Sequence, residues 1–305
     1  MVRLISGVLL AAAFFTLVWF SNAIVLLFVA LAVGVLALHE YFELMRQLGA
    51  AIPRAAAVAA TMAVIAIVPF PYVAPVGVMG VGVVLIAIGA MVQQARLKPG
   101  PAVGERQSQL ASPDSAAQGP AVSGPGSPDP AGPGFSRAST GSLFGALTGG
   151  FALLYIGAPL GALVSIHIFG GRGAVVLLVA TIVISDSAQY YSGRAFGRHP
   201  LAPRLSPKKT IEGAVGGFVV APVFLYFAGP YLIPVATPLM IAPLGLVLVA
   251  CGIAGDLFES MIKRAADMKD SSALIPGHGG ILDRIDALLF ATPPFYMFVR
   301  WVYTA

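Results

Sequence analysis

The residues best suited to chemistry are two acidic pairs near the C-terminal end of the sequence. Asp256 precedes Glu259 by three residues, and Asp283 precedes Asp286 by the same spacing. On a helix, residues three positions apart share a face, so each pair could hold a cation between its carboxylates or one metal ion apiece. With no Cys or second His nearby, the ligands would all be hard oxygens. That set favours Mg²⁺ over zinc, with Mn²⁺ as the alternative and room for a second cation.

Cationic and hydroxyl side chains accompany these carboxylates. The run Ser206-Pro207-Lys208-Lys209-Thr210 precedes an apolar segment, and Pro207 is predicted to lie in the first turn of a helix. Free backbone N–H groups, hydroxyls and two lysines at a helix start would suit an anion such as phosphate. Alternatively, the lysines contact lipid headgroups. Further cations flank the acidic pairs: Lys263, Arg264, Lys269 and Arg284.

A glycine-rich turn, Pro276-Gly277-His278-Gly279-Gly280, lies between the two acidic pairs. Glycine reaches backbone angles that other residues avoid, so the main chain there could approach a ligand closely. His278 could contact a phosphate or a base, or bond only to the local backbone. Carboxylates for a metal beside cations for phosphates are the parts that phosphoryl or nucleotidyl transfer needs, because the protein's task there is positioning and charge neutralisation.

The elements that carry these residues must lie in a membrane. Hydrophobic residues make up 58% of the 305 residues and charged residues only 10%, and the mean hydropathy is +0.88. A water-soluble fold could not cover its surface with so few polar groups. Continuous apolar runs of about 17–25 residues argue against a β-barrel and predict an all-α, polytopic integral membrane bundle of about nine transmembrane helices. The predicted spans lie at about 4–20, 22–39, 55–70, 74–93, 142–168, 173–192, 211–228, 238–255 and 284–303.

The distribution of cations predicts the orientation of these spans. With a cytoplasmic N-terminus and alternating spans, all but two of the 18 Lys and Arg residues lie in or beside cytoplasmic segments, as the positive-inside rule requires. The same topology puts Asp186, Glu212 and both acidic pairs at the cytoplasmic ends of their spans. Ionisable groups are costly there and mark either function or a buried salt bridge, so we expect these carboxylates to converge in one site.

Residues 94–141 divide the chain into two parts. They are rich in Pro, Gly, Ser and Ala and are predicted to form a disordered cytoplasmic linker. Residues 1–93 would be a scaffold of four spans, and residues 142–305 a catalytic domain of five. The amphipathic segment 39–46 is predicted to be a solvated helix on the inner membrane face rather than a metal site. A signal peptide ending near residues 21–23 is the alternative to a retained first span, which we favour because a second apolar run follows at once.

The run from Ser260 to Asp286 is similar to the signature of the phosphatidate cytidylyltransferase family. It reads Ser-x-x-Lys-Arg, four residues, Lys-Asp, and then His-Gly-Gly-x-x-Asp-Arg-x-Asp. Ser185-Asp186 and the segment from Ser206 to Gly213 also resemble that family, which extends the likeness over about residues 180–300. The N-terminal half resembles it only as a hydrophobic bundle.

The resemblance implies nucleotidyl transfer from CTP to phosphatidate, giving CDP-diacylglycerol and pyrophosphate for phospholipid biosynthesis. The implied setting is the inner membrane of a bacterium, with the site facing the cytoplasm, lipid around the protein and no nucleic acid partner. The resemblance also implies a homodimer, which nothing in the sequence itself requires.

The resemblance and the spacing together give each candidate residue a role. Asp256 and Asp283 are expected to be the principal metal ligands. The expected second ligands or supporting groups are Glu259, Asp286 and Asp186. The cations expected to neutralise the triphosphate and the lipid phosphate are Lys208, Lys209, Lys263, Arg264 and Arg284. The residues expected to contact the nucleotide or its phosphates also include Ser206, Thr210, Lys269, His278, Gly279 and Gly280.

Two other functions fit parts of the pattern. An ion-coupled transporter could use the acidic residues to bind a cation, but such sites tend to lie near the bilayer midplane between inverted repeats, and the halves show no repeat. Transfer from a CDP-lipid to an alcohol would resemble an Asp-x-x-Asp-Gly pattern, which the sequence lacks.

Overall fold

The computed structural model describes residues 15–50, 52, 54–69, 145, 147–268 and 279–304, most of which are helical. The predicted span 74–93, the linker 94–141 and most of the predicted span 4–20 lie outside the described residues. The elements in chain order are helices α2 (Ala23–Gln47) and α3 (Arg54–Ile67), the π-helix η2 (Leu153–Gly157), helix α7 (Ala158–Phe196), strands β1 (Pro200–Ala202) and β2 (Ser206–Thr210), and helices α8 (Ile211–Leu232), α9 (Pro238–Ile241), α10 (Leu244–Ala265) and α11 (Leu282–Thr304).

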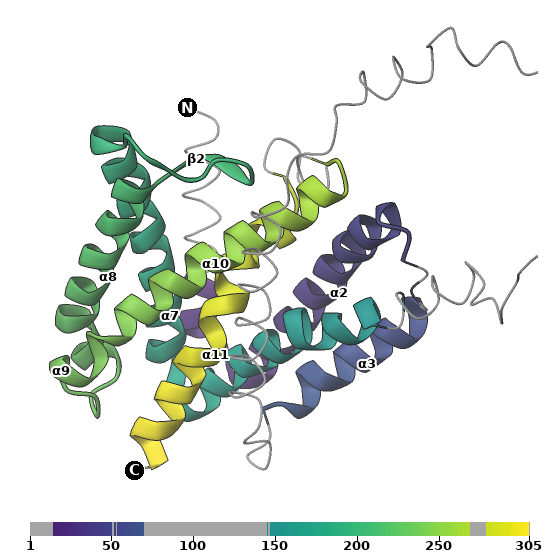
Figure 1. The fold of residues 1–305 in the computed structure, drawn as a ribbon. Coiled ribbons are helices and arrows are strands. Elements are labelled where there is room, and N and C mark those ends of the chain that lie inside the picture. The colour runs from purple at the N-terminus through teal and green to yellow at the C-terminus, as the bar shows by residue number, and fades with distance from the viewer. Residues whose placement is uncertain are drawn as a thin grey trace, which may run out of the picture.

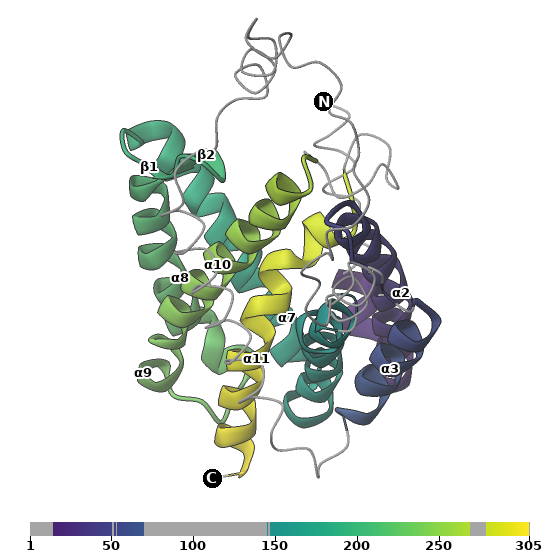
Figure 2. The ribbon, with the colours of Figure 1, turned by 45° about the vertical axis from the view of Figure 1, so that its right-hand side comes forward.

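Helices α10 and α11 pack side by side in the middle of the described structure. Figure 1 shows α8 and α9 on one side of this pair and α2 and α3 on the other, and Figure 2 shows the same order from a second direction. Helix α7 packs against α8 and α11, and it also contacts α2 and α3. The N-terminal helices therefore pack directly against the half of the chain that carries the acidic pairs.

Four helical stretches in the described part of the chain are long and apolar enough to cross a membrane. They are Ala23–Gln47, Leu147–Phe196, Ile211–Leu232 and Pro238–Ala265. On α8, the apolar side chains of Val215, Val219 and Val223 recur every fourth residue and are exposed, as expected for a helix face in contact with lipid. The helical, membrane-spanning class is thus supported, while nine spans and a cytoplasmic N-terminus stay predictions.

The described parts of the predicted spans 142–168 and 173–192 lie in one helical stretch, Leu147–Phe196, which is kinked at a glycine. Gly171 has φ 71° and ψ −177°, a conformation essentially reserved for glycine, so the helix cannot run straight through it. The two segments meet at this kink, between the two spans that the apolar runs predicted.

Helix α2 corrects the interpretation of residues 39–46. The predicted solvated helix on the membrane face is instead the last part of α2, which runs unbroken to Gln47. Glu40 and Leu44 are completely buried, and Tyr41 nearly so. The tertiary contacts of this helix end, which the hydropathy pattern does not reveal, bury it against the rest of the protein.

A two-stranded hairpin corrects the purely helical expectation. Strands β1 and β2 are antiparallel, with Pro200 opposite Thr210 and Ala202 opposite Ser206. Pro207 therefore lies in strand β2 and not in the first turn of a helix. Helix α8 begins at Ile211, as predicted, because the Thr210 hydroxyl caps it by accepting a hydrogen bond from the backbone N–H of Gly213 at 3.1 Å.

Aromatic rings join the central helices to the N-terminal ones. The ring of Tyr155 in η2 lies 6.1 Å from that of Tyr41 in α2, 5.2 Å from that of Phe258 in α10 and 6.0 Å from that of Phe290 in α11, between centroids. Buried rings at these separations contribute both apolar area and favourable edge-to-face contacts. This cluster fixes the helix ends from which the acidic pairs project.

Candidate active site

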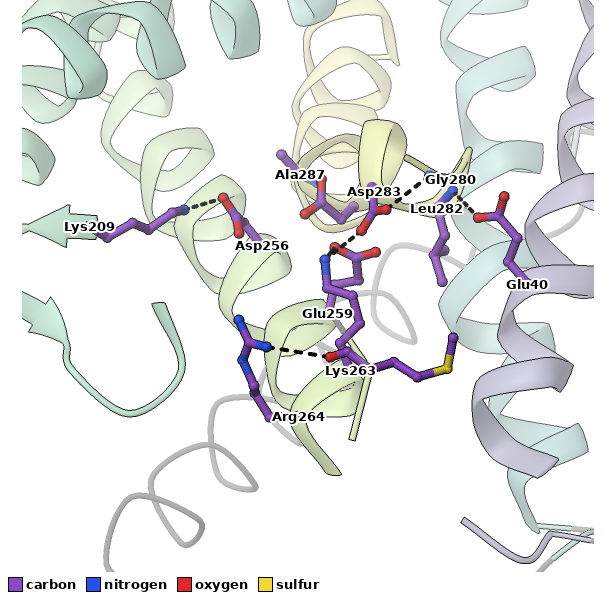
Figure 3. A network of polar contacts seen from close by, with 12 residues as sticks. Glu40, Lys209, Asp256, Glu259, Lys263, Arg264, Gly280, Leu282, Asp283 and Ala287 are labelled. Carbon is purple, nitrogen blue, oxygen red and sulfur yellow. Dashed lines mark hydrogen bonds and ion pairs between the residues drawn. The ribbon is translucent and has the colours of Figure 1, made fainter. Parts of the chain in front are cut away.

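A largely buried lysine joins carboxylates from the two central helices. Lys263 Nζ lies 2.9 Å from Glu259 Oε2 and 2.5 Å from Asp283 Oδ1 (Figure 3). The side chain of Glu259 is only 2% exposed, and those of Lys263 and Asp283 are each 14% exposed. Charges so shielded from water interact strongly, and unpaired they would be costly. Lys263 thus links Glu259 of one helix to Asp283 of the other. The sequence had instead grouped Asp256 with Glu259 and Asp283 with Asp286.

Close helix packing makes this bridge geometrically attainable. Glu259 and Lys263 lie one turn apart on α10, while Asp283 lies in the first turn of α11. A Cβ atom at Gly255 would lie 2.4 Å from the carbonyl oxygen of Asp286, so only glycine lets the two backbones approach this closely. Because Gly255 has no side chain, α11 can pack close enough to α10 for Asp283 to contact Lys263.

The glycine-rich turn also shapes the surroundings of Asp283. Gly280 donates its backbone N–H to Asp283 Oδ2 at 3.0 Å. Gly279 has φ 77°, and a Cβ atom there would lie 2.9 Å from the same oxygen. The predicted unusual backbone angle is confirmed at Gly279. Gly279 therefore leaves room for the Asp283 carboxylate, and the N–H of Gly280 holds one of its oxygens.

A second ion pair connects the hairpin to α10. Lys209 of strand β2 pairs with Asp256, whose side chain is 40% exposed. The charges of Asp186 and Asp286 both interact with those of Asp256 and Lys209, and Asp286 also interacts with Lys263. Asp286 is buried and accepts a hydrogen bond from the backbone N–H of Ala287 at 2.7 Å. The structure thus brings Glu259 and Asp283 together at Lys263, while the charge of Asp286 interacts with both ion pairs.

Among the described residues, no group of three or more His, Cys, Asp or Glu side chains is arranged to hold a metal ion. Glu259 Oε1 is nevertheless a buried oxygen that receives no hydrogen bond from the described residues. An unused hard oxygen beside Asp283 and Asp286 fits a cation such as Mg²⁺. The donor set is thus compatible with the predicted metal, and the ligand roles stay predictions.

The other predicted contacts lie at the edge of this cluster. Ser206 and Thr210 lie at the two ends of strand β2 and are half-buried. The other described cations that were predicted to bind phosphate are exposed: Lys208, Arg264 and Arg284. Arg264 donates a 3.5 Å hydrogen bond to the carbonyl oxygen of Met268. Lys269 and His278 lie outside the described residues.

Glu212, which the sequence grouped with the acidic pairs, has different partners. Its Oε1 lies 2.6 Å from His199 Nδ1, and its Oε2 accepts the backbone N–H groups of Arg198 and His199 at 3.1 and 3.3 Å. These partners lie in the segment just before β1, so Glu212 links that segment to the first turn of α8.

Glu40 is a member of the site region that sequence reasoning missed. It lies on α2, is completely buried, and accepts hydrogen bonds from the backbone N–H groups of Ile281 at 2.9 Å and Leu282 at 2.8 Å. The available signal was an acidic residue following an apolar run, where burial is expensive. Its partners are more than 240 residues away, and no local pattern identifies them.

Comparison with known proteins agrees with this chemistry. The model of the cytidylyltransferase family matches residues 1–302. Phosphatidate cytidylyltransferase of Haemophilus influenzae is 45% identical over 137 residues, covering 43% of this chain and 48% of that protein. The enzyme of the same name from Bacillus subtilis is 39% identical over 150 residues, covering 48% of this chain and 55% of that one.

The uncharacterized protein YnbB of Escherichia coli is 42% identical over 135 residues, covering 44% of this chain and 45% of YnbB. The chain thus spans about half the length of the curated relatives it matches. Because the family model covers nearly all of the sequence, the chain belongs to the cytidylyltransferase family.

Proposed function

We propose that this protein transfers the cytidylyl group of CTP to phosphatidate, giving CDP-diacylglycerol and pyrophosphate. The observation that carries the proposal is the bridge from Lys263 to Glu259 and Asp283, with the Lys209–Asp256 pair beside it. Interleaved carboxylates and ammonium groups suit a reaction whose substrates are two phosphate anions and whose catalysis is positioning and charge neutralisation. The names of the curated relatives support the choice of substrates.

In the proposed reaction a phosphate oxygen of phosphatidate forms a bond to the α-phosphorus of CTP. The bond from that phosphorus to the oxygen bridging the α- and β-phosphates breaks, and its electron pair leaves on pyrophosphate. Phosphatidate is already anionic near neutral pH, so no strong general base is required. No covalent intermediate with the protein forms.

The chain's own residues would bind and orient the two anions. Lys209 and Lys263 are held by carboxylates, so their positions are set before the phosphates arrive and little side-chain entropy is lost on binding. Exposed Lys208, Arg264 and Arg284 would meet the phosphates from the solvent side. Ser206 and Thr210 would donate hydroxyl hydrogen bonds to phosphate or nucleotide. Mg²⁺ held by Asp256 and Asp283, with Glu259, Asp286 and Asp186 in support, would neutralise charge that develops on the phosphates.

The proposed setting is the inner membrane of a bacterium, with the site at the cytoplasmic face. The bias of Lys and Arg toward one set of loops supports this orientation. Phosphatidate presents its phosphate at the headgroup level of that leaflet, and CTP is soluble, so a site at the helix ends would let them meet.

A direct test compares the purified protein with its Asp256→Asn variant. Radioactive cytidine from CTP should enter chloroform-soluble lipid with the wild-type protein when phosphatidate is supplied. The variant should lose this turnover while keeping its thermal unfolding profile. Asp267→Asn is the matched control, since Asp267 is an exposed carboxylate at the end of α10 with φ 54°, a conformation that Asn tolerates. Near-normal turnover by Asp256→Asn, or cation uptake into vesicles without any CTP conversion, would contradict the proposal.

A further inference from the structure

The carboxylate of Glu40 fastens the N-terminal half of the protein to the start of α11. One oxygen accepts the Ile281 N–H at 2.9 Å. The other accepts the Leu282 N–H at 2.8 Å (Figure 3). Glu40 has no exposed surface. The first N–H groups of a helix lack partners within it, and they carry partial positive charge, so a carboxylate there is well compensated.

Packing around the neighbouring residue holds this carboxylate in place. The Tyr41 hydroxyl donates a 3.0 Å hydrogen bond to the carbonyl oxygen of Thr148, and the Tyr41 ring packs on Tyr155. These contacts join α2 to the stretch that leads into η2. Contacts other than its bonds to Ile281 and Leu282 therefore hold Glu40 in position, as a positioning group requires.

Three consecutive backbone N–H groups at this helix start donate to carboxylates. Gly280 donates to Asp283, while Ile281 and Leu282 donate to Glu40. Asp283 follows Leu282 directly in the chain, so any movement of the N–H groups held by Glu40 also moves the carboxylate that Lys263 contacts at 2.5 Å. These three N–H groups are already used by protein carboxylates, so they are not available to substrate phosphates.

We propose that Glu40 is a positioning residue for the reaction. It fixes the start of α11 and thereby the place of Asp283 relative to Lys263. This inference rests on the proposed function. It also gives the N-terminal half of the chain a part in catalysis, exerted through the position of Asp283, beyond that of a scaffold.

The test is the full-length Glu40→Gln variant in the assay for CTP-dependent lipid labelling. Glutamine has nearly the same shape, but its NH₂ group would face one of the two backbone donors, so one N–H of α11 loses its acceptor. We expect kcat to fall about 10- to 100-fold, as for groups that support an active-site ligand, with the KM for CTP changed by less than about twofold. Glu40→Asp keeps the charge but is shorter, and should retain more activity than Glu40→Gln.

Hydrogen exchange provides a readout that does not depend on activity. Peptides covering residues 279–290 should exchange faster in Glu40→Gln, whereas those of α10 should not. Glu43→Gln is the matched control on the same helix, because Glu43 is partly exposed and pairs with Arg46 and Arg54 away from α11. It should match the wild-type protein in both measurements.

The outcomes separate this inference from the proposed function. Wild-type kcat in Glu40→Gln would overturn the positioning role, and so would unchanged exchange at 279–290. A fall in kcat accompanied by an equal loss in Glu43→Gln would also overturn it. If the wild-type protein itself fails to convert CTP, the proposed function fails, and the exchange measurement alone decides whether Glu40 fixes α11. If Glu40→Gln does not fold, Glu40→Asp decides, with full kcat contradicting the role.

Discussion

Lys263 and Asp283, twenty residues apart in the sequence, lie 2.5 Å apart between ammonium nitrogen and carboxylate oxygen. This contact joins α10 to α11 and also brings Glu259 into the same network. A single ammonium group thus balances two carboxylates that the protein largely shields from water.

Removing this cation should damage both folding and activity. In Lys263→Met two neighbouring carboxylates lose their common partner, and breaking a buried ion pair costs about 3–5 kcal/mol. Thermal unfolding in detergent should show the lower stability, and CTP turnover should fall to background. The double variant Lys263→Met with Glu259→Gln should regain part of the stability but none of the activity. A fully active Lys263→Met protein would contradict the role of Lys263.

Adding a methyl group at Gly279 should disturb Asp283 directly. In Gly279→Ala the new Cβ atom would lie 2.9 Å from Asp283 Oδ2, and alanine is strained at φ 77°. Turnover should therefore fall by at least about tenfold. Gly49→Ala separates the two causes, because Gly49 has φ 83° but no atom of the described residues lies within 4 Å of the added Cβ atom. Equal loss of turnover in both variants would mean that backbone strain alone, and not the Asp283 contact, is responsible.

The close approach of α10 and α11 can be tested at Gly255. A Cβ atom in Gly255→Ala would lie 2.4 Å from the Asp286 carbonyl oxygen, so the helices must separate, at a cost of about 1–3 kcal/mol. Both stability and turnover should fall. Gly252→Ala is the control on the same helix, since among the described residues its Cβ atom would meet only Ala287 Cβ, at 3.8 Å. If Gly252→Ala is affected as strongly as Gly255→Ala, tight packing at Gly255 does not explain the site.

Chelation tests the predicted metal. Because the candidate ligands are all carboxylate oxygens, EDTA should abolish turnover, and Mg²⁺ or Mn²⁺ should restore it where Zn²⁺ does not. Thermal unfolding should change little on chelation if the metal acts mainly in catalysis. Undiminished turnover in excess EDTA would exclude the metal from the reaction.

The sequence predicted helices well wherever an apolar run carried the signal. The runs at 211–228 and 284–303 correspond to α8 and α11, and the gap between 168 and 173 contains the break at Gly171. Hydrophobic length decides such elements locally, so no knowledge of tertiary contacts was needed.

The errors arose where contacts with another segment of the chain, near or distant, decide the structure. Pro207 fits a helix start in isolation, but strand β1 pairs with its segment. Glu40 follows an apolar run like many solvated residues, but Ile281 and Leu282 bury it from the far end of the chain. The candidate site shows the same limit: residue types identified Glu259, Lys263 and Asp283, whereas their pairing depends on how α10 meets α11.

The central claim is that the cytidylyl group, and not the terminal phosphate, moves to the lipid. It can be tested by supplying phosphatidate vesicles with CTP labelled at either the α- or the γ-phosphate and counting the chloroform-soluble label. The α-label should enter lipid in step with pyrophosphate release, and the γ-label should stay in the water phase. Lipid that acquires the γ-label, or that acquires no label from either nucleotide, would contradict the account.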